Sequence, residues 1–190
     1  MSDALLPLGG AAFEGIVTIR ETGPQGMIQL RGDLSDPGLA AAVEQASGAA
    51  MPAPLGAHVT GPRGLLWMSP DELMVLVPYA DAARTVAELG RALGDRHALV
   101  ADVSDARAHF TVEGAHLRDV LAKLTPADMR REALAPGTLR RTRLAQVAAG
   151  LWLRDPLTAQ VFCFRSVAGY MFDLLSAAAS EGSEVFHHRA

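Results

Sequence analysis

Lysine and cysteine are almost absent from this sequence, whose 190 residues contain one of each, Lys123 and Cys163. A single cysteine excludes an internal disulfide, and no apolar run approaches the roughly 18 residues that span a bilayer. The first residues also lack the basic and then apolar segments of a secretory signal, which predicts a cytoplasmic protein. The formal net charge of -4 makes nucleic acid and anionic membranes poor candidates as partners.

Arginine, alanine and glycine take the place of lysine on the expected surface. Lysine is depleted and arginine enriched where proteins meet, so this bias is typical of a subunit whose faces contact other proteins. A GC-rich genome produces the same bias, and the composition alone leaves both explanations open. Hydrophobic residues make up 49% of the chain and charged residues 20%, as in ordinary globular domains. A chain of this length needs neither a metal nor a disulfide to fold.

Hydrophobic periodicity and turn residues predict strands that alternate with helices. Asp36-Pro37 marks the start of one helix, because proline is favoured at the first helical position. The residues Ser69-Pro70-Asp71-Glu72 match a helix cap, but the short apolar run after them, stopped by Pro78, favours a hairpin with a tight turn. The expected strands cover 27–33, 65–68, 72–77, 98–103, 108–114 and 159–165, with two more in 139–155 around Ala148–Gly150. The expected helices cover 37–47, 80–93 and 117–124, and Ser166 caps a last helix with a buried stripe of Val167, Tyr170, Met171, Leu174 and Leu175.

The order of these elements nearly repeats in the two halves of the chain, as strand, helix, strand, strand, helix, strand. Each half therefore resembles a split βαβ unit. The sequence predicts an α+β fold of two similar, ferredoxin-like lobes with mostly antiparallel sheets. We expect a single domain over 27–180, with lobes at about 27–103 and 104–180. Residues 1–26 form an N-terminal segment, and residues 181–190 are expected to be a flexible tail.

The stretch DVSDARAHFTVEG gathers several chemically active side chains: Asp102, Ser104, Asp105, Arg107 and His109. Two carboxylates close to an arginine can tune each other's pKa values for acid–base catalysis. Aspartate and serine between two strands more commonly bond their own backbone and shape the turn. An arginine beside two carboxylates mainly keeps both of them ionised, which suits a structural ion pair. We therefore interpret the stretch as a junction between lobes and not as an active site.

The other reactive residues form no recognisable site. No histidine has a Cys, Asp or Glu partner at metal-ligand spacing, so no metal site is predicted. Cys163, inside VFCF, is expected to be a buried apolar residue, because a nucleophilic thiol needs a positive and partly open environment. Serine-hydrolase, dinucleotide and P-loop motifs are absent, and GPRG at 61–64 is too short to hold phosphate. Five arginines between 130 and 143 favour a solvated face or an interface that supplies carboxylates: Arg130, Arg131, Arg140, Arg141 and Arg143.

Four segments of the chain resemble a known family, in the same order and at natural spacing over 27–178. The family is the gamma subunits of heterotetrameric sarcosine oxidases, which are distantly similar to the folate-binding fold of the glycine cleavage T-protein, an aminomethyltransferase. The segments are GLLWMSPDELMVLVP, VADVSDARAHFTVEGAHLRDVLAKLTPADMR, PGTLRRTRLAQVAAGLWLRD and FRSVAGYMFDLL.

The sequence departs from the aminomethyltransferases at the place where, by the resemblance, those proteins carry an acidic pair. That pair follows a hairpin turn, and here AQVAAGLWLRD carries Gly150, Leu151, Trp152 and Leu153 at this place, with no carboxylate before Asp155. Leucine or tryptophan replaces a carboxylate neither in proton transfer nor in binding folate nitrogens. We therefore expect no catalytic residue in this chain, and the sequence assigns no cofactor-binding residue.

The resemblance implies a non-catalytic gamma subunit that packs mainly on the alpha subunit, in a complex completed by beta and delta subunits. Such a complex demethylates sarcosine oxidatively to glycine and transfers the one-carbon unit to tetrahydrofolate. FAD, FMN, NAD and tetrahydrofolate are expected on the other subunits and none in this chain. Residues 47–64, expected to be irregular, and the arginines of 130–143 are the expected contact surfaces. The alternatives are a stand-alone folate-binding, aminomethyltransferase-like protein and a structural module for some other partner.

Overall fold

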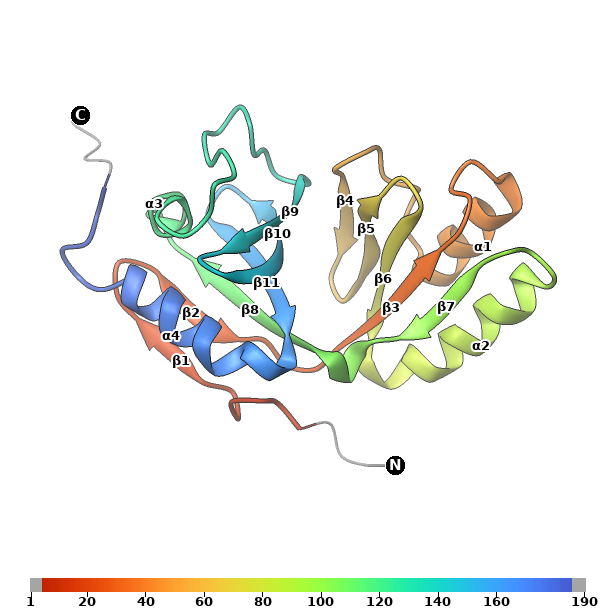
Figure 1. Cartoon of the computed structure of the whole chain (residues 1–190), viewed down its shortest axis with the longest axis horizontal. Coiled ribbons are helices and arrows are strands. Elements are labelled where there is room, and N and C mark those ends of the chain that lie inside the picture. The colour runs from red at the N-terminus through yellow and green to blue at the C-terminus, as the bar shows by residue number, and fades with distance from the viewer. Residues whose placement is uncertain (1–4, 186–190) are drawn as a thin grey trace. The chain divides into compact units, whose positions relative to one another are not determined.

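The computed structural model describes residues 5–185, which form two compact units (Figure 1). The continuous unit runs from Pro24 to Asp105, and the discontinuous unit joins the residues before Pro24 to those from Ala106 onward. All strand pairings in the described residues are antiparallel. The predicted α+β fold with mostly antiparallel sheets is confirmed. Of the predicted tail 181–190, residues 186–190 lie outside the described residues.

The continuous unit is a five-stranded sheet in the order β4-β5-β6-β3-β7, with two helices packed on it (Figure 1). Its elements are β3 (Gln25–Arg31), α1 (Pro37–Ser47), β4 (Ala57–Thr60), β5 (Arg63–Ser69), β6 (Glu72–Pro78), the 3-10 turn η1 (Tyr79–Asp81), α2 (Ala82–Leu93) and β7 (Leu99–Asp102). Its core joins strand and helix residues that include Ile28, Leu30, Leu39, Val43, Leu65, Leu73, Val75, Leu89 and Leu93.

Helix α1 begins and ends as its sequence predicts. The Asp36 carboxylate accepts the N–H of Gly38 at 2.7 Å, and Pro37 is the first helical residue. Capping by a side-chain oxygen satisfies one of the backbone donors that the first turn leaves free. Gly48 ends the helix at a φ of 71°, a left-handed conformation that glycine adopts without a steric penalty.

The hairpin prediction is also confirmed, because β5 and β6 pair on either side of Pro70-Asp71. The expectation that 47–64 is wholly irregular is wrong at its end, since Ala57–Thr60 forms β4 and pairs with β5. His58 and Thr60 are exposed on this edge strand, whereas Ala57 is buried. So short a strand with polar residues gives too weak an alternation to be recognised among the surrounding Pro and Gly.

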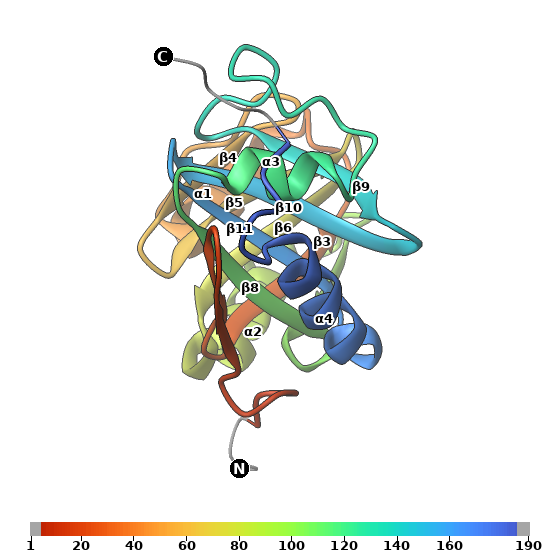
Figure 2. The same cartoon turned by 90° about the vertical axis from the view of Figure 1, so that its left-hand side faces the viewer.

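The discontinuous unit is a six-stranded sheet in the order β1-β2-β8-β11-β10-β9. Helices α3 and α4 lie across one face of this sheet (Figure 2). Its elements are β1 (Ala12–Glu14), β2 (Thr18–Glu21), β8 (Arg107–Glu113), α3 (Leu117–Ala122), β9 (Leu139–Leu144), β10 (Val147–Asp155), β11 (Thr158–Phe164), the 3-10 turn η3 (Arg165–Val167) and α4 (Ala168–Ala178).

The two sheets share one strand order, which confirms the similarity of the lobes. The order β4-β5-β6-β3-β7 corresponds to β9-β10-β11-β8-β2. In the continuous unit the edge strand next to β3 is β7, which follows α2 in the chain. In the discontinuous unit the corresponding position next to β8 is occupied by β2, from the N-terminal segment. Residues 12–21, for which the sequence predicts no element, therefore complete the second sheet.

Three local expectations in the second half of the chain are wrong. The turn between β9 and β10 lies at Ala145, which has a φ of 49°, and not at Ala148–Gly150, because β10 begins already at Val147. Ser166 does not cap α4; it lies in η3, and Val167 precedes the helix without a side-chain cap. Tyr170 is 51% exposed, while Met171 and Leu175 form the buried side of α4.

No described helix is long and apolar enough to cross a membrane.

Candidate functional site

The candidate cluster that starts at Asp102 lies where one compact unit ends and the other begins. Asp102 ends β7, Asp105 is the last residue of the continuous unit, and the 3-10 turn η2 covers Ser104–Ala106. One oxygen of the Asp102 carboxylate accepts both the N–H of Ser104, at 3.0 Å, and its hydroxyl, at 2.5 Å. The turn-shaping role predicted for this pair is confirmed.

The remaining polar groups of the turn are bound to the same unit. The Ser104 oxygen accepts the N–H of Met27 at 3.0 Å in a buried position, and Tyr79 donates its hydroxyl to the Asp105 carboxylate at 2.9 Å. Neither carboxylate has a hydrogen bond to a histidine of the described residues, so the Ser104 hydroxyl lies beside no base of the kind that activates a nucleophile. The arrangement holds β7 against the start of β3 and provides no acid–base pair.

Replacing Ser104 with alanine is expected to lower the free energy of unfolding by about 1–3 kcal/mol, because the buried N–H of Met27 loses its acceptor. Ser69→Ala is the matched control, since its hydroxyl also donates to an aspartate two residues on, Asp71, but at an exposed site. That control is expected to cost under about 0.5 kcal/mol. Urea denaturation of the two variants tests this expectation, and equal losses would contradict it.

His109 alternates with core residues along β8, which lies within the predicted strand 108–114. Phe110 and Val112 point into the core beneath the helices, whereas His109 lies on the other face, buried and stacked on Trp152 with 5.4 Å between ring centroids. Burial, and secondarily the charge of Arg154, lowers the pKa of His109 to about 4. Neither ring nitrogen hydrogen-bonds to a described residue. The ring is therefore neutral near pH 7 and has no partner for a proton relay.

Cys163 is buried on β11, as predicted, with its sulfur 3.4 Å from the carbonyl oxygen of Phe164. Burial raises the pKa of the Cys163 thiol to about 11, against the smaller opposing effect of Arg107. The thiolate is the nucleophilic form of cysteine, so this side chain is inert at neutral pH. The Arg107 guanidinium itself lies 4.1 Å over the centre of the Phe164 ring.

The hairpin that departs from the aminomethyltransferase pattern is filled by core residues. Gly150 to Leu153 are all buried on β10, and Leu151 and Leu153 belong to the core beneath the helices. A side chain at Gly150 would collide with the ring of Phe162, which lies 2.2 Å from the position of an added Cβ. Asp155, the first carboxylate after this stretch, accepts the N–H of Leu157 at 2.8 Å and so shapes the next turn. This part of β10 therefore offers no group for proton transfer.

Two of the five clustered arginines bind within their own unit. Arg130 pairs with Asp128 at 2.6 Å and, by hydrogen bonding, lowers the pKa of Asp128 to about 2. Arg140 donates to the carbonyl oxygens of Ala133 and Leu139. These contacts order the connection between α3 and β9.

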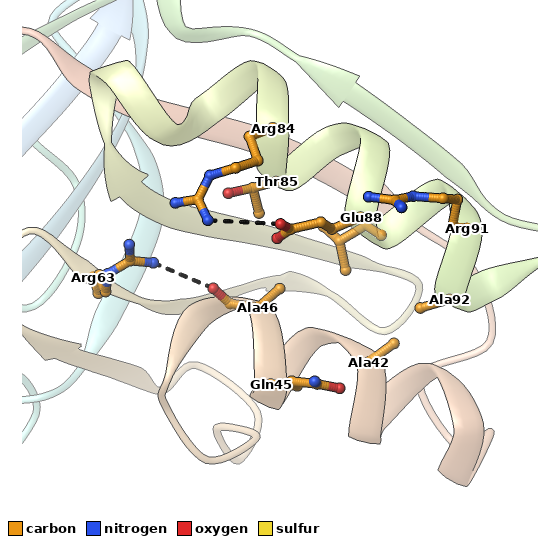
Figure 3. A pocket seen from close by; sticks show the side chains of 10 residues that line it. Ala42, Gln45, Ala46, Arg63, Arg84, Thr85, Glu88, Arg91 and Ala92 are labelled. Carbon is orange, nitrogen blue, oxygen red and sulfur yellow. Dashed lines mark hydrogen bonds and ion pairs between the residues drawn. The ribbon is translucent and has the colours of Figure 1, made fainter.

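A pocket of about 580 Å³ lies between α1 and α2 and is lined by Arg63, Arg84, Glu88 and Arg91 (Figure 3). Asp81 binds Arg63 at 2.5 Å and Arg84 at 2.8 Å, and Arg84 also reaches Glu88 at 3.6 Å. The hydrogen bond to Asp81 raises the pKa of Arg84. These ion pairs join Arg63 and Arg84 to Asp81 and Glu88, as is common on a solvated surface.

A second, more apolar pocket of about 750 Å³ lies beside α3; it is lined by α3, residues 127–132 and the turn between β10 and β11. In its wall the buried carboxylate of Asp119 is 3.2 Å from the Nδ1 atom of His116. This pair is not predicted from the sequence, although the spacing of three residues on a helix permits it. No group of three or more His, Cys, Asp or Glu side chains converges in residues 5–185 as a metal site would require.

Comparison with known proteins matches residues 31–181 to the model of the sarcosine oxidase gamma subunit family. The sarcosine oxidase subunit gamma of Corynebacterium sp. (strain U-96) is 30% identical over 152 residues, which cover 78% of this chain and 72% of that one. The heterotetrameric sarcosine oxidase of Corynebacterium sp. U-96, solved in complex with pyrrole 2-carboxylate, contains a chain of the same fold. That chain gives a TM-score of 0.84 at 25% identity, covering 97% of this chain and 99% of that one.

A more distant structural neighbour shows the wider fold. The glycine cleavage system aminomethyltransferase T of Bartonella henselae matches with a TM-score of 0.59 at 13% identity, over 85% of this chain and 46% of that one. The family match, the Corynebacterium subunit and the chain of the solved oxidase agree with one family. The chain belongs to the sarcosine oxidase gamma subunit family.

Proposed function

We propose that this protein is the non-catalytic gamma subunit of a heterotetrameric sarcosine oxidase and supports its assembly by docking on the alpha subunit. The match of residues 31–181 to the gamma subunit family carries the proposal. The complex demethylates sarcosine oxidatively to glycine and transfers the one-carbon unit to tetrahydrofolate. Its FAD, FMN, NAD and tetrahydrofolate are held by the other subunits, and the beta and delta chains complete the tetramer in the cytoplasm.

The chemistry of the described residues supports a role without catalysis. Catalytic acids and bases need a reachable proton and a suitable pKa. Here the Asp102 and Asp105 carboxylates hold a turn, Cys163 is a buried thiol, and the acidic pair of the aminomethyltransferases is replaced by core residues. The stand-alone aminomethyltransferase alternative gains no support from these contacts.

The connection between α1 and β4 is the contact surface that we propose for the alpha subunit. Leu55 lies there with 46% of its surface exposed and a φ of 64°. A leucine in this left-handed region is strained, and an exposed apolar side chain gains nothing from the surrounding water. A partner that buries Leu55 accounts for both features. The arginines of 130–143 remain a second predicted contact surface.

Replacing Leu55 with asparagine is expected to weaken binding to the alpha subunit by roughly 10-fold, as for loss of a central apolar anchor. The isolated chain is expected to keep its stability within about 0.5 kcal/mol, since asparagine tolerates positive φ. The measurement is surface plasmon resonance of the full chain on an immobilised alpha subunit. Leu99→Asn, at an exposed leucine on β7, the edge of the same sheet opposite β4, is the control and is expected to bind normally. Normal binding by Leu55→Asn would exclude this contact surface.

A further inference from the structure

We propose that the pocket beside α3 is a binding site for a small organic anion with an apolar body. This α3 pocket has a volume of about 750 Å³, within the usual range of roughly 300–1,000 Å³ for small-molecule sites. The inference concerns residues of the discontinuous unit alone and does not rest on the proposed place of the chain in an oxidase.

The walls of the α3 pocket supply the apolar surface. Leu157, on the turn between β10 and β11, is 53% exposed at this site, although a leucine side chain contributes more to stability when it is buried. An apolar ligand that covers Leu157 would remove this surface from water. The apolar lining residues are Ala115, Ala122, Ala127, Met129, Pro156 and Leu157.

Three arginines and three carboxylates line the pocket, and two of the arginines, Arg118 and Arg131, have no ion pair within the described residues. Its charged lining residues are Arg118, Asp119, Asp128, Arg130, Arg131 and Glu132. Two carboxylates already have partners: Asp128 pairs with Arg130 at 2.6 Å, and Asp119 binds His116 at 3.2 Å. No ion pair joins Arg118 or Arg131 to any carboxylate of residues 5–185. Arg118 and Arg131 can therefore bind an anionic group of a ligand, beside Glu132, the lining carboxylate that has no ion pair within residues 5–185.

Arg118 is held in place for a ligand. Its guanidinium donates to the carbonyl oxygens of Met129, at 2.7 Å, and Leu134, at 2.9 Å. These acceptors are neutral, so they do not compensate the positive charge, and three of the five N–H groups remain. Burial and then the charge of Arg131 lower the pKa of Arg118, and the opposing effect of Glu132 is smaller. Two nearby cations in a partly apolar wall form a site that a carboxylate or sulfonate would neutralise.

Two dyes with the same aromatic rings test the site in the purified full chain. The anionic probe is 8-anilino-1-naphthalenesulfonate, and the neutral probe is N-phenyl-1-naphthylamine. In fluorescence titrations the sulfonate dye is expected to bind saturably at one site and to be displaced by octanoate but not by octylammonium. Arg131→Gln is expected to weaken binding of the sulfonate dye by about 5-fold and binding of the neutral dye by less than about 2-fold, since only a charge is lost.

Two further variants separate the apolar contribution from a general effect of charge. Leu157→Ser is expected to weaken binding of both dyes, because each dye covers the same apolar wall of the pocket. Arg91→Gln removes an arginine from the pocket between α1 and α2 and is expected to change neither. Unsaturable dye binding, equal displacement by octylammonium, or an effect of Arg91→Gln as large as that of Arg131→Gln would overturn the proposal. Arg131 is exposed and has no ion pair with a described residue, so its variant folds as the parent does.

Discussion

Leu151→Glu is expected to unfold the discontinuous unit and not to restore an acid for catalysis. Leu151 is fully buried at the middle of β10, in the core beneath α3 and α4. A carboxylate there loses its hydration inside an apolar core, and burying an ionised group is among the costliest single changes. Arg140, opposite Leu151 on β9, already donates to the carbonyl oxygens of Ala133 and Leu139. We expect a loss of more than about 4 kcal/mol in the free energy of unfolding. Circular dichroism during urea denaturation measures it.

Ala148→Glu is the matched control for this prediction. Ala148 lies on the same strand, three residues earlier, and is exposed. The same carboxylate is expected to cost under about 1 kcal/mol there, because it keeps its hydration. If Leu151→Glu folded with normal stability, the hairpin would not be a closed part of the core, and the argument against an acidic site on β10 would fail.

Lowering the pH from 6.5 to 4 is expected to remove about 3 kcal/mol of stability through His109 alone. Unfolded histidine gains a proton near pH 6.5, whereas burial holds the pKa of folded His109 at about 4. The unfolded chain therefore binds more protons over this range, and stability falls as the pH falls. The measurement is the free energy of unfolding at several pH values.

His109→Phe keeps an aromatic ring beside Trp152 but cannot take up a proton. The variant is expected to lose the His109 contribution, so that its stability between pH 6.5 and 4 varies less than that of the parent by about 3 kcal/mol. The same slope in His109→Phe and the parent would show that His109 does not resist protonation.

The sequence predicts those parts of the fold that depend on neighbouring residues. Helix α1 is predicted with its cap at Asp36 because the cap, the proline and the apolar stripe lie within one short segment. The hairpin of β5 and β6 is predicted because its strands flank a single tight turn. In both cases the deciding contacts join residues close in the chain.

Long-range pairing explains most of what the sequence does not reveal. Strand β2 pairs with β8 although Arg20 and Thr111, partners in the register, are far apart in the chain. No local pattern reports such a partner. Tyr170 has the helical spacing of a core residue, yet the sheet determines which side of α4 is buried, and Met171 and Leu175 occupy it. The expected buried stripe is therefore too wide by this residue.

The candidate site shows the same difference between contacts of residues close in the chain and long-range contacts. That Asp102 shapes a turn follows from its separation of two residues from Ser104. The bond from Met27 to the Ser104 hydroxyl spans 77 positions and becomes visible only in the structure. The α3 pocket likewise combines α3, residues 127–132 and Leu157, which no motif connects.

The central claim, that this chain supports the assembly of a sarcosine oxidase without catalysing its reaction, is tested most directly by leaving the chain out. The alpha, beta and delta subunits are co-expressed with and without it, and sarcosine turnover, subunit stoichiometry and thermal stability are measured. We expect one stoichiometric four-chain complex and, without this chain, an alpha subunit that assembles poorly and loses activity on warming. A three-chain oxidase that is equally active and equally stable would contradict the account.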